Sequence, residues 1–262
     1  MGRISDKFTE LKEKREKALV SYLMVGYPDY ETSLKAFKEV LKNGTDILEI
    51  GFPFSDPVAD GPTIQVAHEV ALKNGIRFED VLELSETLRK EFPDIPFLLM
   101  TYYNPIFRIG LEKFCRLSRE KGIDGFIVPD LPPEEAEELK AVMKKYVLSF
   151  VPLGAPTSTR KRIKLICEAA DEMTYFVSVT GTTGAREKLP YERIKKKVEE
   201  YRELCDKPVV VGFGVSKKEH AREIGSFADG VVVGSALVKL AGQKKIEDLG
   251  NLVKELKEGL RE

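Results

Sequence analysis

Three carboxylates lie close together in a stretch that could carry proton-transfer chemistry. Glu49 lies inside a short apolar run, and Asp56 and Asp60 follow it in a loop that opens with Gly51 and Pro53. Strands buried on both faces usually consist of unbroken apolar residues, so a glutamate inside one needs an explanation. Burying an ionised carboxylate without a partner is costly. Either an ion pair holds Glu49 in a structural role, or Glu49 has the raised proton affinity of a general acid or base.

A second set of residues could bind a phosphate group. Two apolar runs near the C-terminus end in glycine, one in Gly212-Phe213-Gly214 and the other in Gly234-Ser235. Glycine lets the backbone approach an anion closely, and the free N–H groups at a helix start point toward it. The alternative is that these glycines only form tight turns. The polar segment 180–186 could close over a substrate as a lid, although an ordinary surface loop could have the same composition.

The apolar periodicity predicts the elements that must position these residues. Runs of strand length alternate with segments of helical spacing along the whole chain. The predicted strands are 18–25, 46–50, 97–101, 125–128, 147–151, 174–178, 208–211 and 230–233. The predicted helices are 4–17, 30–43, 62–74, 78–91, 111–121, 134–145, 157–170, 191–204, 217–224 and 246–260.

This alternation predicts an α/β fold with a parallel sheet and right-handed crossovers. Eight strand–helix units match the (β/α)8 TIM barrel, and a doubly wound open sheet is the alternative. No linker or change of composition marks a boundary, so we expect a single domain over residues 1–262, with an extra helix at the N-terminus. In such a barrel the active site lies at the carboxyl ends of the strands, where the carboxylates and glycines fall.

The composition excludes several other classes of protein. Lys plus Arg is 42 and Asp plus Glu is 43, so no basic surplus indicates nucleic-acid binding. The apolar runs are too short to span a membrane, and the N-terminus lacks the apolar core of a signal peptide, so a cytoplasmic protein is expected. Charged residues make up 32% of the chain while Asn and Gln are few, a composition typical of thermophilic proteins.

The cysteines and histidines show no metal-binding pattern. Cys115, Cys167 and Cys205 are widely spaced and form no zinc or redox motif, so we interpret them as packing residues. His68 and His220 lie in charged helical segments, where we expect them to face solvent or pack rather than bind a metal. A metal centre built on histidines is therefore not expected.

In order and spacing, these segments resemble the tryptophan synthase α-chain family. The resemblance extends over the whole chain and is carried by LEIGFPFSDPVADG at 48–61, Tyr102 with Asn104-Pro105, the segment 129–132, Ser178 with 180–184, 212–214, and 234–235. It implies a (β/α)8 barrel that needs no metal or organic cofactor. Its substrate would be a small phosphate ester, indole-3-glycerol phosphate, which a retro-aldol reaction splits into indole and glyceraldehyde 3-phosphate.

The resemblance also implies roles for individual residues. Glu49 would transfer protons, Asp60 would stabilise the positive charge that develops at the indole N–H, and Tyr175 would support the reacting side chain. Thr183 would contact Asp60 from the lid. The indole pocket would be formed by Tyr22, Met100, Tyr102 and Ile127, although core packing is the alternative for the tyrosines. The phosphate would bind at Gly184, Gly214, Gly234 and Ser235, with Phe213 also contacting the substrate.

The resemblance further implies a protein partner. Members of the family dock on a PLP-dependent β subunit in an α2β2 heterotetramer, and the matching surface here would be Pro53, Asp56, 102–107 and 130–132. Three alternatives stay open. The chain could be a stand-alone indole-3-glycerol-phosphate lyase, a different phosphate-binding barrel such as a sugar-phosphate isomerase, or a catalytically silent subunit that only activates its partner.

Overall fold

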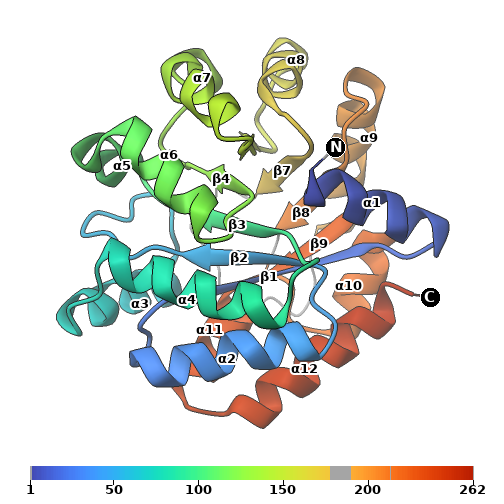
Figure 1. The fold of residues 1–262 in the computed structure, drawn as a ribbon. Coiled ribbons are helices and arrows are strands. Elements are labelled where there is room, and N and C mark those ends of the chain that lie inside the picture. The colour runs from blue at the N-terminus through green and yellow to red at the C-terminus, as the bar shows by residue number, and fades with distance from the viewer. Residues whose placement is uncertain (1, 178–189, 213, 262) are drawn as a thin grey trace.

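The computed structural model describes residues 2–177, 190–212 and 214–261, and across these residues nine parallel strands form one sheet at the centre of the molecule (Figure 1). The spatial order is β5-β4-β3-β2-β1-β9-β8-β7-β6. The strands are β1 Ala18–Met24, β2 Ile47–Gly51, β3 Phe97–Met100, β4 Gly125–Ile127, β5 Ser149–Phe150, β6 Leu153–Gly154, β7 Thr174–Val177, β8 Val209–Gly212 and β9 Gly230–Val233.

The two edge strands, β5 and β6, are two halves of one segment that closes the sheet. Only Val151 and Pro152 separate them. The Val151 N–H donates to the carbonyl of Phe126 at 3.0 Å, and the Tyr175 N–H donates to the carbonyl of Pro152 at 3.2 Å. The segment 149–154 therefore bonds β4 on one side and β7 on the other. The predicted (β/α)8 barrel is confirmed and the open-sheet alternative is wrong, whereas the single domain over residues 1–262 stays a prediction.

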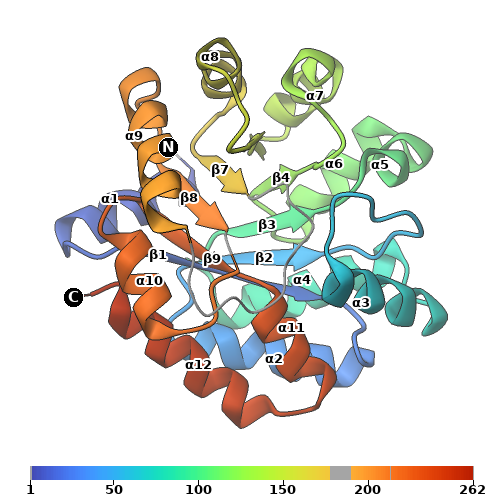
Figure 2. The ribbon, with the colours of Figure 1, turned by 180° about the vertical axis from the view of Figure 1, so that it is seen from behind.

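Helices surround the sheet, as the view from behind also shows (Figure 2). They are α1 Arg3–Glu13, α2 Tyr30–Lys42, α3 Pro62–Lys73, α4 Phe78–Glu91, α5 Tyr103–Ile109, α6 Leu111–Glu120, α7 Glu137–Lys145, α8 Arg160–Ala169, α9 Tyr191–Leu204, α10 Lys218–Gly225, α11 Ser235–Gly242 and α12 Ile246–Gly259. The sequence analysis did not predict α5 and α11, which have seven and eight residues. In the described part of the chain, none of the helices is both long and apolar enough to cross a membrane.

The predicted extra helix at the N-terminus, α1, covers one end of the barrel. Its buried residues Ile4 and Leu11 belong to the cluster that fills the barrel interior, together with Val20, Ile47 and Leu98. Alternate strand residues such as Leu19 face outward, where they join the larger cluster that packs against the helices. Counting in steps of two from a residue of the interior cluster, such as Val20 of β1, therefore tells which residues of a strand point into the barrel.

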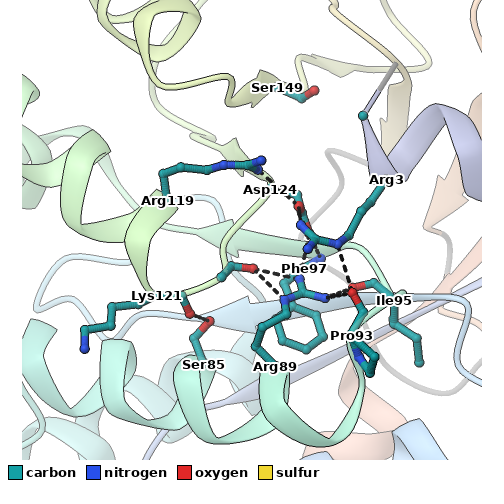
Figure 3. Close-up of polar contacts among 12 residues, drawn as sticks. Arg3, Ser85, Arg89, Pro93, Ile95, Phe97, Arg119, Lys121, Asp124 and Ser149 are labelled. Carbon is teal, nitrogen blue, oxygen red and sulfur yellow. Dashed lines mark hydrogen bonds and ion pairs between the residues drawn. The ribbon is translucent and has the colours of Figure 1, made fainter.

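An arginine cluster fastens the same end of the barrel (Figure 3). Asp124, directly before β4, accepts hydrogen bonds from Arg3 Nη1 at 2.7 Å, Arg89 Nη2 at 2.8 Å and the Phe97 N–H at 2.8 Å. Arg119 Nη1 adds a longer contact of 3.4 Å. The guanidinium of Arg89 also lies 3.8 Å from the centre of the Phe97 ring. This network joins α1, α4, α6 and the starts of β3 and β4, opposite the predicted active site.

The interpretation of all three cysteines as packing residues is wrong for two of them. Cys167 of α8 and Cys205, just after α9, form a disulfide with their Cα atoms 5.6 Å apart, while Cys115 is buried and free. Sequence spacing could not reveal this pair because 38 residues separate the two cysteines, and only the packing of α8 against α9 brings them together. Asp206 lies close to both sulfur atoms, but the disulfide removes the two thiolates that a metal would need.

Candidate active site

Glu49 points into the barrel from the middle of β2. It follows Ile47 on the same face of the strand, and Ile47 belongs to the interior cluster. Its side chain is 1% exposed, and Oε2 has no hydrogen-bond partner among the described residues. Burial, and then the negative charge of Asp60, raise the pKa of Glu49 to about 8. The structural ion pair that we considered is therefore wrong for the described part of the chain, where Glu49 is a mainly protonated carboxylic acid at neutral pH.

Residues of four other strands surround this carboxyl group on the same interior face. Tyr22 of β1 lies opposite Glu49 in the parallel register, and Met100 of β3 follows the interior residue Leu98. Ile127 and Tyr175 belong to the interior cluster directly. The residues that the sequence predicted for the indole pocket and for catalysis are therefore brought to one end of the barrel, at the carboxyl ends of the strands.

The two interior tyrosines are uncharged hydroxyl donors. Burial comes first, and the charges of Glu49 and Asp60 add to it, in raising the pKa of Tyr22 and of Tyr175 well above the ordinary value. Glycines make room for both rings. A Cβ at Gly51 would lie 2.5 Å from the Tyr22 hydroxyl, and one at Gly212 would lie 3.1 Å from the Tyr175 hydroxyl. A larger residue at Gly51 would therefore displace the Tyr22 ring.

Asp60 is held by two donors that the loop and its neighbours supply. The Tyr102 hydroxyl donates to Asp60 Oδ2 at 2.8 Å, and His68 Nε2 lies 3.0 Å from the same oxygen. The Ala59 N–H in turn donates to the Tyr102 hydroxyl at 3.1 Å. The Phe54 ring stacks on the Tyr102 ring with a centroid distance of 5.2 Å. The loop before α3 is thus fastened to the start of α5, and Asp60 is fixed at the mouth of the barrel.

The sequence did not reveal the part that His68 plays. His68 is only 3% exposed, so it does not face solvent, and the packing alternative is the correct one for this residue and for His220. The helical spacing of Ile64, Ala67 and Ala71 could have indicated that position 68 lies on the buried face of α3. Nothing in the sequence pattern, however, indicated its contact with Asp60.

The predicted phosphate residues that the structure describes, Gly214, Gly234 and Ser235, lie at the same end of the barrel. Gly234 is the N-cap of α11, which begins at Ser235, so the first backbone N–H groups of this helix have no partner within the helix itself. A Cβ at Gly234 would lie 3.7 Å from the Cβ of Tyr22. The start of α11 therefore lies beside one of the interior-facing residues named above. Gly214 has φ +63°, which favours glycine, and a Cβ there would meet nothing within 4 Å. The predicted residues Thr183, Gly184 and Phe213 lie outside the described residues.

Comparisons with known proteins point to a single family. The family model described as tryptophan synthase alpha chain matches residues 8–261. A protein named tryptophan synthase alpha chain from Geobacter sp. is 44% identical over 264 residues, which is 99% of this chain and 98% of that protein. One of the same name from Methanocaldococcus jannaschii is 45% identical over 255 residues, covering 97% of this chain and 90% of the relative.

Solved structures agree in fold. A structure from Aquifex aeolicus VF5, described only as a structural study, is 96% identical, with full coverage of both chains and a TM-score of 0.94. The structure of tryptophan synthase subunit alpha from Legionella pneumophila is 35% identical, with 99% of this chain and 98% of that chain covered and a TM-score of 0.92. The thermophilic character predicted from the composition agrees with the Aquifex structure.

Proposed function

The chain belongs to the tryptophan synthase alpha chain family, and from this premise we propose that it is a carbon–carbon lyase that cleaves indole-3-glycerol phosphate into indole and glyceraldehyde 3-phosphate. The observation that carries this proposal is Glu49, a buried carboxyl group with a pKa of about 8 inside an apolar strand. A retro-aldol cleavage needs a group that gives a proton at neutral pH and then takes one back. The ordinary pKa of a glutamate would leave it without a proton to give.

One carboxyl group is sufficient for both proton transfers. Protonated Glu49 delivers its proton to the indole C3 carbon, which places a positive charge on the indole ring. The resulting carboxylate takes the proton of the hydroxyl group on the adjacent side-chain carbon. The C–C electron pair then returns to the ring as the aldehyde forms, so indole and glyceraldehyde 3-phosphate leave and Glu49 is protonated again. Tyr175, on the same interior face, would support the side chain being cleaved.

Asp60 would stabilise the charge that this protonation creates. After C3 accepts a proton, the positive charge is shared with the indole nitrogen, and a fixed carboxylate near that N–H lowers the energy of the charged state. Tyr22, Met100, Tyr102 and Ile127 would form the flat apolar walls that suit an indole ring. At the far end of the substrate, Gly214, Gly234 and Ser235 would bind the phosphate through backbone N–H groups and a hydroxyl.

We also propose that a PLP-dependent β subunit docks on the face around the active site, in an α2β2 heterotetramer. Asp130 Oδ1 accepts a hydrogen bond from the Tyr103 N–H at 2.9 Å, which joins two of the predicted contact segments. Phe107 on α5 is 66% exposed and Val58 in the loop before α3 is 80% exposed, so apolar surface is free for a partner. Pro53 is buried, so its contribution would be indirect.

The decisive experiment measures indole release from indole-3-glycerol phosphate by the purified chain, alone and with a β subunit from the same source. We expect slow release alone, faster release with the partner, and none from Glu49→Gln. The matched control is Glu172→Gln, because Glu172 accepts hydrogen bonds from Ser5 and Ser149 at the opposite end of the barrel. Fast release that the partner does not change would indicate the stand-alone lyase instead. No release under either condition would overturn the proposal.

The docking surface has its own test. Phe107→Ser should weaken co-elution of the β subunit with this chain. Val147→Ser is the matched control, since Val147 is similarly exposed, at 69%, but lies just before β5 at the other end of the barrel. Equal binding of the partner by both variants would contradict this docking face. The predicted cytoplasmic location stays a prediction, and transport of the chain out of the cytoplasm would contradict it.

A further inference from the structure

We propose that His68 is a positioning residue for the reaction, which orients Asp60 through a neutral imidazole ring. The inference rests on the function proposed above for Asp60. No catalytic role was predicted for His68, and its ring is too deeply placed to be a surface histidine, with only 3% of the residue exposed. Its two ring nitrogens have two different partners, and these partners determine what the ring can do.

The hydrogen-bond pattern determines which nitrogen carries the proton. The Phe54 backbone N–H donates to His68 Nδ1 at 2.9 Å, so Nδ1 must present a lone pair. In a neutral imidazole the proton then lies on Nε2. His68 Nε2 is 3.0 Å from Asp60 Oδ2 and therefore donates to it. A second proton on Nδ1 would face the Phe54 N–H, donor against donor, so this arrangement selects the neutral ring.

The hydrogen bond from His68 leaves one Asp60 oxygen for the substrate. The Tyr102 hydroxyl and the His68 Nε2–H both donate to Oδ2, at 2.8 and 3.0 Å. Two donors on one oxygen fix the rotation of the carboxylate, so that Oδ1 is the oxygen left to accept from the indole N–H. Because both donors are neutral, Asp60 keeps its full negative charge. A lysine or arginine at position 68 would cancel much of the charge that the reaction needs.

The same ring also holds the loop that carries Asp60. His68 bonds the loop at Phe54 and again at Asp60, six residues later, and Tyr102 meets the same two residues through ring stacking and a hydrogen bond. The result is a closed circuit of Phe54, His68, Asp60 and Tyr102. Loss of the His68 contact would free the carboxylate to rotate, even if the barrel stays folded. The expected defect is therefore in the chemical step rather than in substrate binding.

Two substitutions test the two hydrogen bonds of the His68 ring one at a time. In His68→Gln the side-chain amide extends about as far as Nε2, so it can still donate to Asp60. In His68→Asn the shorter amide reaches only the position of Nδ1, so it can accept from Phe54 but cannot donate to Asp60. Loss of one hydrogen bond to a charged group predicts that kcat falls roughly 10- to 100-fold in His68→Asn, with KM changed less than about threefold. In His68→Gln, kcat should recover to within about fivefold of the unsubstituted chain.

A purely structural role would give a different result. If His68 only fills space, the two variants should lose turnover in parallel with their loss of thermal stability. Asp124→Asn provides the stability control, because Asp124 lies at the opposite end of the barrel and its loss should lower the melting temperature without lowering kcat. Equal kcat in His68→Asn and in the unsubstituted chain would overturn the inference. If the unsubstituted chain itself releases no indole, the proposed function fails instead, so the two failures are distinguishable.

Discussion

Asp60 raises the proton affinity of Glu49, since its negative charge adds to the burial that lifts the Glu49 pKa to about 8. Asp60 itself is in contact with Tyr102 and His68 at its Oδ2 atom. Two carboxyl groups at one end of the barrel thus have different surroundings, since Glu49 is buried with an unpartnered Oε2 among the described residues and Asp60 is hydrogen-bonded. This difference supports the roles that we propose, with Glu49 as the acid and Asp60 as the fixed anion.

The pH dependence of turnover should follow Glu49. Because the proposed mechanism begins with the protonated form, the single-turnover rate of indole formation should be level below pH 8 and fall as the pH rises through about 8. The measurement is single-turnover indole release between about pH 6 and about pH 10. A rate that increases through the same interval would mean that ionised Glu49 begins the reaction.

Removal of the Asp60 charge should shift the pH at which the rate of indole formation falls. Asp60→Asn should lower the pKa of Glu49 below about 8, because one of its two causes is lost, while burial, the larger cause, keeps the pKa above the ordinary 4.5. Infrared titration of the Glu49 carboxyl group, assigned by its absence in Glu49→Gln, measures this directly. An unchanged titration midpoint would show that Asp60 does not act on Glu49 through its charge.

Glu49 should also make stability depend on pH. The folded pKa of about 8 lies above the ordinary 4.5, so the folded state holds a proton in this interval that the unfolded state has released. Stability should therefore fall as the pH rises from about 4.5 to about 8, by at most about 5 kcal/mol. In Glu49→Gln this contribution is absent, so denaturant unfolding should show the variant gaining stability relative to the unsubstituted chain as the pH rises. A constant difference across the interval would contradict the raised pKa.

The disulfide should contribute to stability without contributing to turnover. It closes a loop between Cys167 and Cys205, 38 residues apart, for which chain entropy predicts roughly 4 kcal/mol. Disulfides inside the cell are uncommon except in hyperthermophiles, which agrees with the thermophilic composition. Joint replacement of both cysteines by alanine should lower the melting temperature, as should a reductant. Cys115→Ala is the control, because reductant should still lower the melting temperature of that variant. An equal melting temperature with and without reductant would contradict a stabilising bond.

Asp124 should matter for stability and not for the reaction. Its carboxylate is 5% exposed and pairs with Arg89, itself 14% exposed, as well as with the more exposed Arg3 and Arg119. Asp124→Ala would leave Arg89 buried without its carboxylate, which costs about 3–5 kcal/mol. Denaturant unfolding and kcat measured on the same sample test both parts. A loss of kcat in folded protein would mean that this end of the barrel acts on the active site.

The sequence determined the barrel and most of its active-site strands through local patterns. Alternation of strand and helix periods predicts eight parallel strands regardless of detailed packing, because each period reflects how a single element buries one face. Glu49 was identifiable because a carboxylate is out of place in an apolar strand. Gly234 and Ser235 were identifiable because a glycine at a strand end followed by a helix start is itself a local pattern.

Only the tertiary structure decided which side chains meet. The contact of Tyr102 with Asp60 spans 42 residues, that of Arg3 with Asp124 spans 121, and the disulfide spans 38. Such pairs depend on the register of the strands and on how the helices pack around them. Neither can be inferred from the apolar periodicity of a single element. The contact of His68 with Asp60 spans only eight residues, yet it too needed the path of the loop between β2 and α3. The sequence therefore determined where the buried carboxyl group of Glu49 lies, and the packing decided what holds Asp60 in place.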